Sequence, residues 1–207
     1  RASSALLGAP EHEEVDSIAL GRAPRLDSSI ETALLLAALA DRAGDKVHVL
    51  ALDSQVRARV SGVRGAKVIE TLRAFMDISP RLDVTDWSQA VGAIEQTVHH
   101  SAFVVVITKI PPAGMDTDFT DSLARLCERH TVLVASASDP DELRARQGRD
   151  NAEEVFLAAS AALAERSDDA GASDVRMTGA LTVRASAGLL PARTADRYIE
   201  LKKSGRL

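Results

Sequence analysis

The stretch Phe103–Pro112, FVVVITKIPP, is an apolar run that stops at a lysine and two prolines. Its four consecutive β-branched residues, Val104–Ile107, predict a buried strand, because a strand covered on both faces loses the alternation of apolar and polar positions. In open α/β sheets, ligands bind at the carboxyl end of such a strand. The first polar residues at this end are Thr108 and Lys109. The stretch therefore predicts both a central strand and a polar rim that contains a lysine.

Helices and strands alternate on both sides of this stretch. We expect strands at 46–53, 55–62, 103–108 and 131–137, and helices at 26–45, 65–78, 118–130, 139–146, 151–169 and 191–207. Residues 81–100 predict an extended entry into another helix. The alternation and the valine-rich strands predict an α/β fold with three layers, in which helices cover both faces of a mostly parallel sheet. Arg57 and Arg59 alternate with apolar residues, which is typical of an antiparallel hairpin strand at the edge of the sheet.

Two helices carry end signals. Ser28 and Glu31 are spaced as a capping box at the start of the helix at 26–45, and Gly44 marks its end. The triple leucine Leu34–Leu36 predicts that this helix is largely buried against the sheet. The helix at 191–207 has a proline at its start and a glycine past its end, as helix capping favours.

Two segments resist assignment. Residues 1–24 mix turn formers with charges and show no sustained period, and residues 170–189 are ambiguous, with a strand pair around Gly179 as one interpretation. Repeats and low-complexity linkers are absent from the sequence, so we expect residues 1–207 to form a single domain.

The composition excludes several classes of protein. Hydrophobic residues make up 45% of the 207 residues, as in a globular domain, and the net charge of -5 argues against a broad basic surface for nucleic acid. A single cysteine, Cys127, excludes an internal disulfide. The longest apolar stretch, ALLLAALA, is less than half of the roughly 20 residues that a membrane span needs. The start of the sequence has no signal-peptide pattern.

Familiar catalytic motifs are missing. SGVRGAK at 61–67 has the wrong spacing for a phosphate-binding loop, and the sequence contains neither a dinucleotide fingerprint nor a G-x-S-x-G elbow. Asp116, Asp118 and Asp121 lack the other ligands of a calcium loop and are better explained as acidic residues at a helix start. We interpret Cys127 as a buried thiol rather than a nucleophile.

The run Pro24–Asp53, PRLDSSIETALLLAALADRAGDKVHVLALD, strongly resembles the family called domain of unknown function 58. RARV at 57–60, TDW at 85–87 and the closing ADRYIELKKSGRL at 195–207 carry the same resemblance, which covers about three quarters of the chain, Ala23–Arg166 and Leu190–Leu207. It implies a Rossmann-like, von Willebrand factor A-like domain. It also implies a central apolar strand before the first helix, yet residues 1–15 offer only SALLGA. That strand is either supplied poorly by this segment or belongs to residues outside the sequence.

Von Willebrand A domains often bind Mg²⁺ through a D-x-S-x-S motif, a threonine and an aspartate. The resemblance places the first motif at Asp16, where the two serine positions are occupied by Ile18 and Leu20. Thr85 matches the threonine, and Lys109 stands at the aspartate position, where its positive charge would repel the ion. We therefore expect a degenerate metal-ion-dependent adhesion site, with no metal and no cofactor.

The resemblance implies a non-catalytic adaptor, a partner of MoxR-type AAA+ ATPases in the cytoplasm or at the cytoplasmic face of the membrane. We expect its partner-binding rim to comprise Asp16, Thr85, Asp86 and Lys109. The alternatives are a Mg²⁺-dependent ligand binder of the von Willebrand A type and, less favoured, a hydrolase that uses the same rim. The sequence shows no nucleophile–base pair for the latter.

Overall fold

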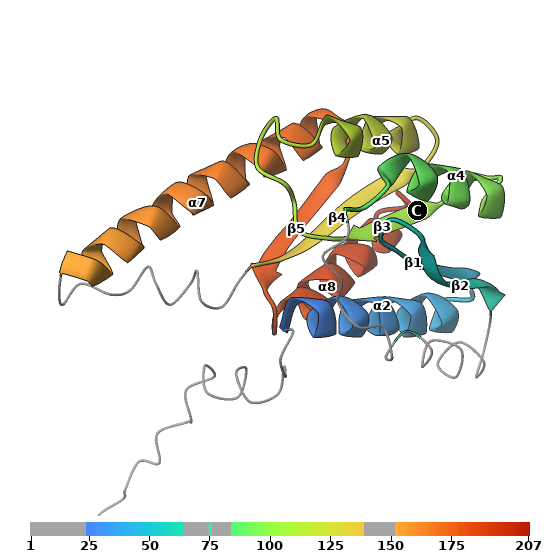
Figure 1. Ribbon diagram of the computed structural model, residues 1–207. Coiled ribbons are helices and arrows are strands. Elements are labelled where there is room, and N and C mark those ends of the chain that lie inside the picture. The colour runs from blue at the N-terminus through green and yellow to red at the C-terminus, as the bar shows by residue number, and fades with distance from the viewer. Residues whose placement is uncertain (1–23, 64–74, 76–83, 139–151) are drawn as a thin grey trace, which may run out of the picture.

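The computed structural model describes residues 24–63, 75, 84–138 and 152–207 (Figure 1). The helices and strands in these ranges form a mixed α/β structure. The helices are α2 (Pro24–Arg42), α4 (Trp87–Thr97), α5 (Thr117–Cys127), α7 (Ala152–Met177) and α8 (Leu190–Lys203). The strands are β1 (Val47–Leu52), β2 (Val56–Val63), β3 (Phe103–Ile107), β4 (Thr131–Ser138) and β5 (Leu181–Ser186).

The strands form two separate sheets within the described residues. β1 and β2 pair as an antiparallel hairpin, whereas β3, β4 and β5 form a parallel sheet in that order. The predicted parallel sheet and antiparallel hairpin are thus confirmed, but the hairpin forms a sheet of its own within the described residues, whereas it was predicted at the edge of the parallel sheet. The predicted helices at 65–78 and 139–146 lie outside the described residues, apart from Phe75, and so does the segment 1–23.

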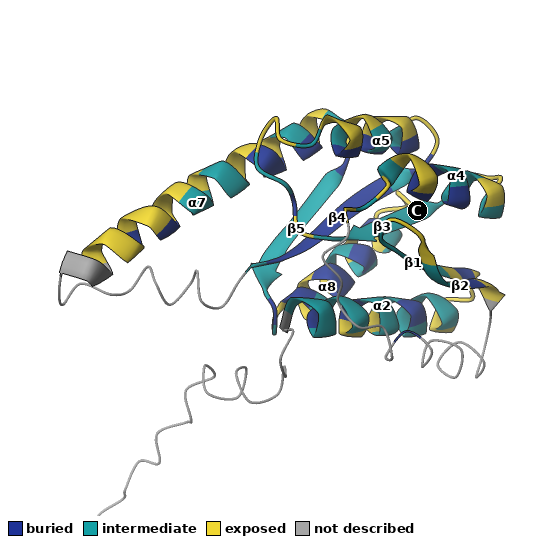
Figure 2. Cartoon of the chain, in the orientation of Figure 1, coloured by how far each residue is buried: buried dark blue, intermediate teal, exposed yellow. Residues whose placement is uncertain are grey.

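Helices cover both faces of the parallel sheet (Figure 2). Val104 and Val106 of β3 pack into a core formed with α4, α5 and α7, while Val105 and Ile107 pack on the opposite face toward Leu190 of α8. The central strand β4 is buried on both faces, and Leu133 is fully inaccessible to solvent. The continuous apolar runs in β3 and β4 follow from this two-sided covering.

The larger core centres on Phe119 of α5, which is fully buried. Its ring lies 4.6 Å from that of Trp87, the first residue of α4. The carboxylate of Asp116 caps α5 by accepting a hydrogen bond from the Phe119 backbone N–H, and it also accepts one from the Trp87 indole N–H. The helix-start explanation of this acidic cluster is therefore confirmed for Asp116.

The segment 170–189 differs from the interpretation of a strand pair around Gly179. Its first part completes the long helix α7, and its second part is β5, parallel to β4. Gly179 has a φ of 94° and sits in the turn between them, a conformation that favours glycine. Arg184 on β5 forms ion pairs with Asp168 and Asp169 of α7. Arg184, a charged residue in the middle of β5, thus serves the contact of this strand with the preceding helix α7.

Helix α2 begins earlier than predicted, at Pro24, so the predicted capping box is wrong. Ser28 lies inside the helix, where it is buried and its hydroxyl donates to the carbonyl oxygen of Ala187 at 2.5 Å. The expected burial of the triple leucine is also wrong, since Leu35 is 37% exposed and its two neighbours are half-buried. The buried residues of α2 are instead small ones, Ser28, Thr32 and Ala37.

Helix α8 contacts both sheets at the end where β1 and β3 begin. The ring of Tyr198 stacks on Phe103 at the start of β3, and its hydroxyl donates to the carboxylate of Asp45, two residues before β1. Lys202 pairs with the same carboxylate. Pro191 in the first turn and Gly205 beyond the last turn, with a φ of 67°, confirm the predicted helix ends.

We expect two histidines to make the stability of the fold dependent on pH. His130 is 7% exposed and neither ring nitrogen has a hydrogen-bond partner among the described residues, and burial, with help from Arg129, lowers its pKa from 6.5. Burial and Lys46 lower the pKa of His48, whose Nδ1 accepts a hydrogen bond from the Gly62 N–H. A lowered pKa means that the folded state binds protons less readily than the unfolded state.

We therefore expect the free energy of unfolding to be highest above about pH 6.5 and to fall as the pH drops below it. Urea unfolding at pH 7.5 and pH 5.5 checks the sign. The His130→Leu variant is expected to lose less stability over this interval than the parent. An equal loss in both would show that His130 does not contribute to the pH dependence.

Candidate functional site

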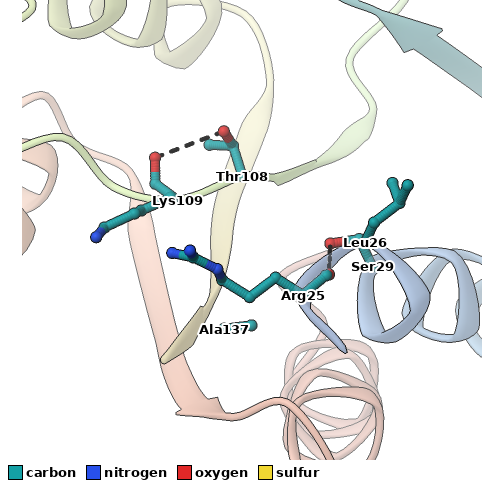
Figure 3. A pocket seen from close by; sticks show the side chains of 6 residues that line it. All are labelled: Arg25, Leu26, Ser29, Thr108, Lys109 and Ala137. Carbon is teal, nitrogen blue, oxygen red and sulfur yellow. Dashed lines mark hydrogen bonds between the residues drawn. The ribbon is translucent and has the colours of Figure 1, made fainter. Parts of the chain in front are cut away.

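A pocket of about 190 Å³ lies where the carboxyl ends of β3 and β4 meet the start of α2 (Figure 3). Its lining residues come from α2, β4 and the loop after β3: Arg25, Leu26, Ser29, Thr108, Lys109 and Ala137. Figure 3 shows Arg25 reaching from α2 toward the loop that carries Thr108 and Lys109. The pocket is thus at the edge of the sheet where α/β proteins bind ligands.

The loop after β3 holds Lys109 between two anchored residues. The Thr108 N–H donates to the Ala135 carbonyl oxygen of β4 at 3.0 Å, and the N–H of the buried Ile110 donates to the Ser136 hydroxyl at 3.2 Å. Lys109 itself is exposed. The side chain of Lys109 is therefore presented from a backbone that hydrogen bonds to β4 hold on both sides.

The other wall of the pocket is fixed by serines of α2. The Ser29 hydroxyl donates to the carbonyl oxygen of Arg25, within the same helix, at 2.7 Å. The neighbouring Ser28 ties the helix to the segment after β5 through Ala187. Arg25 and Ser29 were missed by the sequence predictions, which started the helix at 26 and assigned Ser28 to capping. Pro24, a favoured first-turn residue, was the available signal.

Thr85 and Asp86 lie at the end of β1, just before α4. The Asp86 carboxylate caps α4 by accepting hydrogen bonds from the Gln89 N–H and the Ser88 hydroxyl, both at 2.8 Å. Its own N–H donates to the Asp53 carbonyl oxygen at 3.1 Å. The hydrogen bond from the Gln89 N–H, followed by that from the Ser88 hydroxyl, lowers the pKa of Asp86 from its ordinary value. Asp86 is exposed and Thr85 is half-buried.

The predicted rim residues therefore fall into separate settings. Thr85 and Asp86 belong to the junction of β1 with α4, and Lys109 belongs to the pocket beside α2. Asp16 lies outside the described residues. Asp86 has a helix-capping role that sequence reasoning missed, although an aspartate three residues before Gln89 is a recognisable capping pattern.

The described part of the chain offers little for other chemistry. No three His, Cys, Asp or Glu side chains within it gather into a group that could hold a metal ion. Burial raises the pKa of the Cys127 thiol, which disfavours the thiolate that a nucleophile requires. No described helix combines the length and the apolar character that crossing a bilayer demands.

Comparison with known proteins gives one match. Residues 15–154, more than half of the chain, match a family model described as "Protein of unknown function DUF58". The second stretch of the expected resemblance, Leu190–Leu207, lies beyond the matched residues. No curated protein and no solved structure matches the chain.

Proposed function

The chain belongs to the DUF58 family, and from this premise we propose that it is a non-catalytic adaptor domain with a von Willebrand factor A-like fold. Its partner is a MoxR-type AAA+ ATPase, which it meets in the cytoplasm or at the cytoplasmic face of a membrane. Contact is made through the rim at the carboxyl ends of the strands. The parallel sheet with helices on both faces and the separate antiparallel hairpin are compatible with such a fold.

The observation that carries the proposal is the position of Lys109. It is exposed, directly follows β3 and lines the pocket at the strand ends. In a von Willebrand A domain with an intact metal site, this position carries an aspartate. A lysine there supplies positive charge from the protein itself, and it supports a rim that contacts its partner without Mg²⁺.

Binding to a purified MoxR-type ATPase from the same genome tests the proposal, with the chain immobilised and the ATPase titrated by biolayer interferometry. We expect saturable binding that persists in EDTA. Reversal of one rim charge, Lys109→Glu, should weaken it about tenfold, as expected for one lost charge contact in an interface. Lys203→Glu at the exposed end of α8 makes the same charge change away from the rim and should leave binding intact. Absence of binding by the parent would refute the partner assignment.

Thermal unfolding separates the adaptor from a metal-dependent binder. For a site with a Kd one hundredth of the metal concentration, linkage would add about 2.7 kcal/mol, or about 5–10 °C for a domain of this size. We expect no change in Tm between EDTA, 10 mM Mg²⁺ and 10 mM Mn²⁺ for the parent, nor for Lys109→Asp, because one new carboxylate does not restore a full ligand set. A saturable rise in the parent would favour the metal-dependent alternative.

A further inference from the structure

The two halves of helix α7 have different surroundings. Its second half packs on α5 and β5, where Ala172 and Val175 are buried and belong to the core around Phe119. Its first half extends away from the parallel sheet (Figure 1). The core therefore holds one end of this long helix and leaves the surface of the other end exposed.

The projecting half contains an uncharged run of ten residues, Val155–Ala164, VFLAASAALA. Two of its small residues, Ala158 and Ala161, are buried, but most of this half is exposed (Figure 2). A helix that is apolar around its circumference is usually buried, and exposed apolar patches on globular proteins mark interaction sites. All four large apolar side chains of the run are exposed: Val155 (50%), Phe156 (71%), Leu157 (48%) and Leu163 (67%).

The two most exposed of these side chains share one face of α7. Phe156 and Leu163 are seven residues apart, about two turns, and Ala159 and Ser160 lie between them on the same face. The Ser160 hydroxyl donates to the Phe156 carbonyl oxygen at 3.0 Å, so covering this face would not leave the hydroxyl without a hydrogen bond. The face thus consists of two large apolar side chains separated by two small residues.

This face is complementary to itself when it is read in the opposite direction. In an antiparallel pair with its two-fold axis between Ala159 and Ser160, Phe156 of each copy lies opposite Leu163 of the other. Small residues then meet at the crossing, where they allow the helices to approach closely. The patch is therefore of the kind that a symmetric dimer uses, with the same residues on both copies. A parallel pair would instead bring both protein cores to the same end, where each already occupies the space beside α7.

We propose that the face of α7 formed by Phe156, Ala159, Ser160 and Leu163 binds a second copy of this chain as an antiparallel helix pair. The run spans about 15 Å of helix, so the pair makes a smaller contact than the roughly 800 Å² per partner of a standard interface. We therefore expect a weak dimer, with a Kd of about 10–100 µM. The contact lies on α7, away from the rim proposed to bind the ATPase, and does not depend on that function.

The charges beside the run favour a protein occupant over a lipid surface. Helices that lie on membranes carry lysine and arginine on their polar face, which attracts anionic lipids. Here a single basic residue, Arg166, stands among several acidic ones: Glu153, Glu154, Glu165, Asp168 and Asp169.

Sedimentation velocity of the full chain from about 1 to about 300 µM tests the proposal, with a reductant present because Cys127 is a free thiol. The weight-average mass should rise with concentration from 22.0 kDa toward twice that value. Phe156→Glu and Leu163→Lys should each weaken the association at least about tenfold, because each places an unpaired charge in an apolar contact. Met177→Glu is the matched control, since this side chain is 77% exposed at the last residue of the same helix. It should leave the association unchanged.

An equal mixture of Phe156→Glu and Leu163→Lys tests the direction of the pair. In a mixed antiparallel pair, the new glutamate lies opposite the new lysine, and the remaining phenylalanine lies opposite the remaining leucine. The mixture should therefore associate although neither variant does so alone. In a parallel pair, each new charge would lie opposite an apolar side chain, so a mixture that stays monomeric would overturn the antiparallel arrangement.

A mass of 22.0 kDa at every concentration would overturn the proposal, as would association that persists in both variants or is lost in Met177→Glu. Two measurements on Phe156→Glu would then identify the occupant. Loss of binding to vesicles of phosphatidylcholine and phosphatidylglycerol would assign the run to a lipid surface. A Tm well below that of the parent at about 1 µM, where the parent is monomeric, would show that the chain covers the run itself.

Discussion

Gly171→Ala is expected to lower the free energy of unfolding by about 3 kcal/mol or more, the upper range for overpacking a closely fitted site. A methyl group on Gly171 would lie 2.2 Å from the Pro111 carbonyl oxygen and 3.3 Å from the Ile110 side chain. The oxygen belongs to the backbone of the loop after β3. The preceding residue of this loop, Ile110, is buried, and its N–H donates to the Ser136 hydroxyl. The clash cannot be relieved by rotating a side chain, so α7 or the loop must move.

The measurement is thermal unfolding, in which about 3 kcal/mol corresponds to a fall in Tm of about 6–12 °C for a domain of this size. Gly92→Ala in α4 is the matched control, because nothing lies within 4 Å of the added methyl group. That change should be neutral or stabilise by up to about 1 kcal/mol, since alanine is the better helix former. Similar Tm values for the two variants would show that α7 does not pack on the loop as described.

Gly171 also shows what sequence patterns miss. A side chain is excluded at this position by the loop that contains Pro111, sixty residues earlier in the chain. The surrounding helical stretch is rich in alanine and gives no local sign of that contact. The same holds for Ser28, which looks like a capping residue until its hydroxyl is seen on Ala187. Local patterns identify helices and strands, whereas these roles depend on distant partners.

The strands predicted at 103–108 and 131–137 lie where β3 and β4 are found, but the sequence did not predict how far each strand is buried. The run at 103–108 predicted β3, and TVLVASA predicted β4, because a strand between two helical layers is apolar throughout. The pattern reports what covers the two faces of a strand and says nothing about its edges. Among the described residues, β4 has neighbouring strands on both sides and is buried, whereas β3 has one and is half-buried.

The rim was predicted only in part for a related reason. Lys109 was found because it interrupts an apolar run, and it does line the pocket. Arg25 was not, because an arginine in the first turn of a helix has no distinctive pattern. Asp86 was chosen as a binding residue, but its carboxylate is engaged at the start of α4. A polar residue near a strand end can serve the fold or a partner, and only the contacts distinguish these roles.

Phe119→Ala is expected to have the largest effect on stability of any substitution considered for this chain, about 3–5 kcal/mol. The side chain is fully buried, and its ring lies 4.6 Å from that of Trp87. Its loss leaves a cavity between α4, α5 and β4 and removes an aromatic pair, which contributes about 0.5–1.5 kcal/mol beyond the buried area. The hydrogen bond from the Phe119 backbone to Asp116 is retained, so the loss comes from packing and not from the helix cap.

Urea unfolding monitored by fluorescence gives two measurements in one experiment, because Trp87 is the only tryptophan. The midpoint reports the free energy of unfolding, and the emission of the folded state reports the environment beside residue 119. Phe156→Ala on α7 is the matched control: that ring is 71% exposed, and its removal should cost less than about 0.5 kcal/mol and leave the emission unchanged. If both variants lost the same stability, the aromatic pair could not be the centre of the core. A large loss of stability with an unchanged emission maximum would show that the stabilisation by Phe119 does not depend on its contact with Trp87.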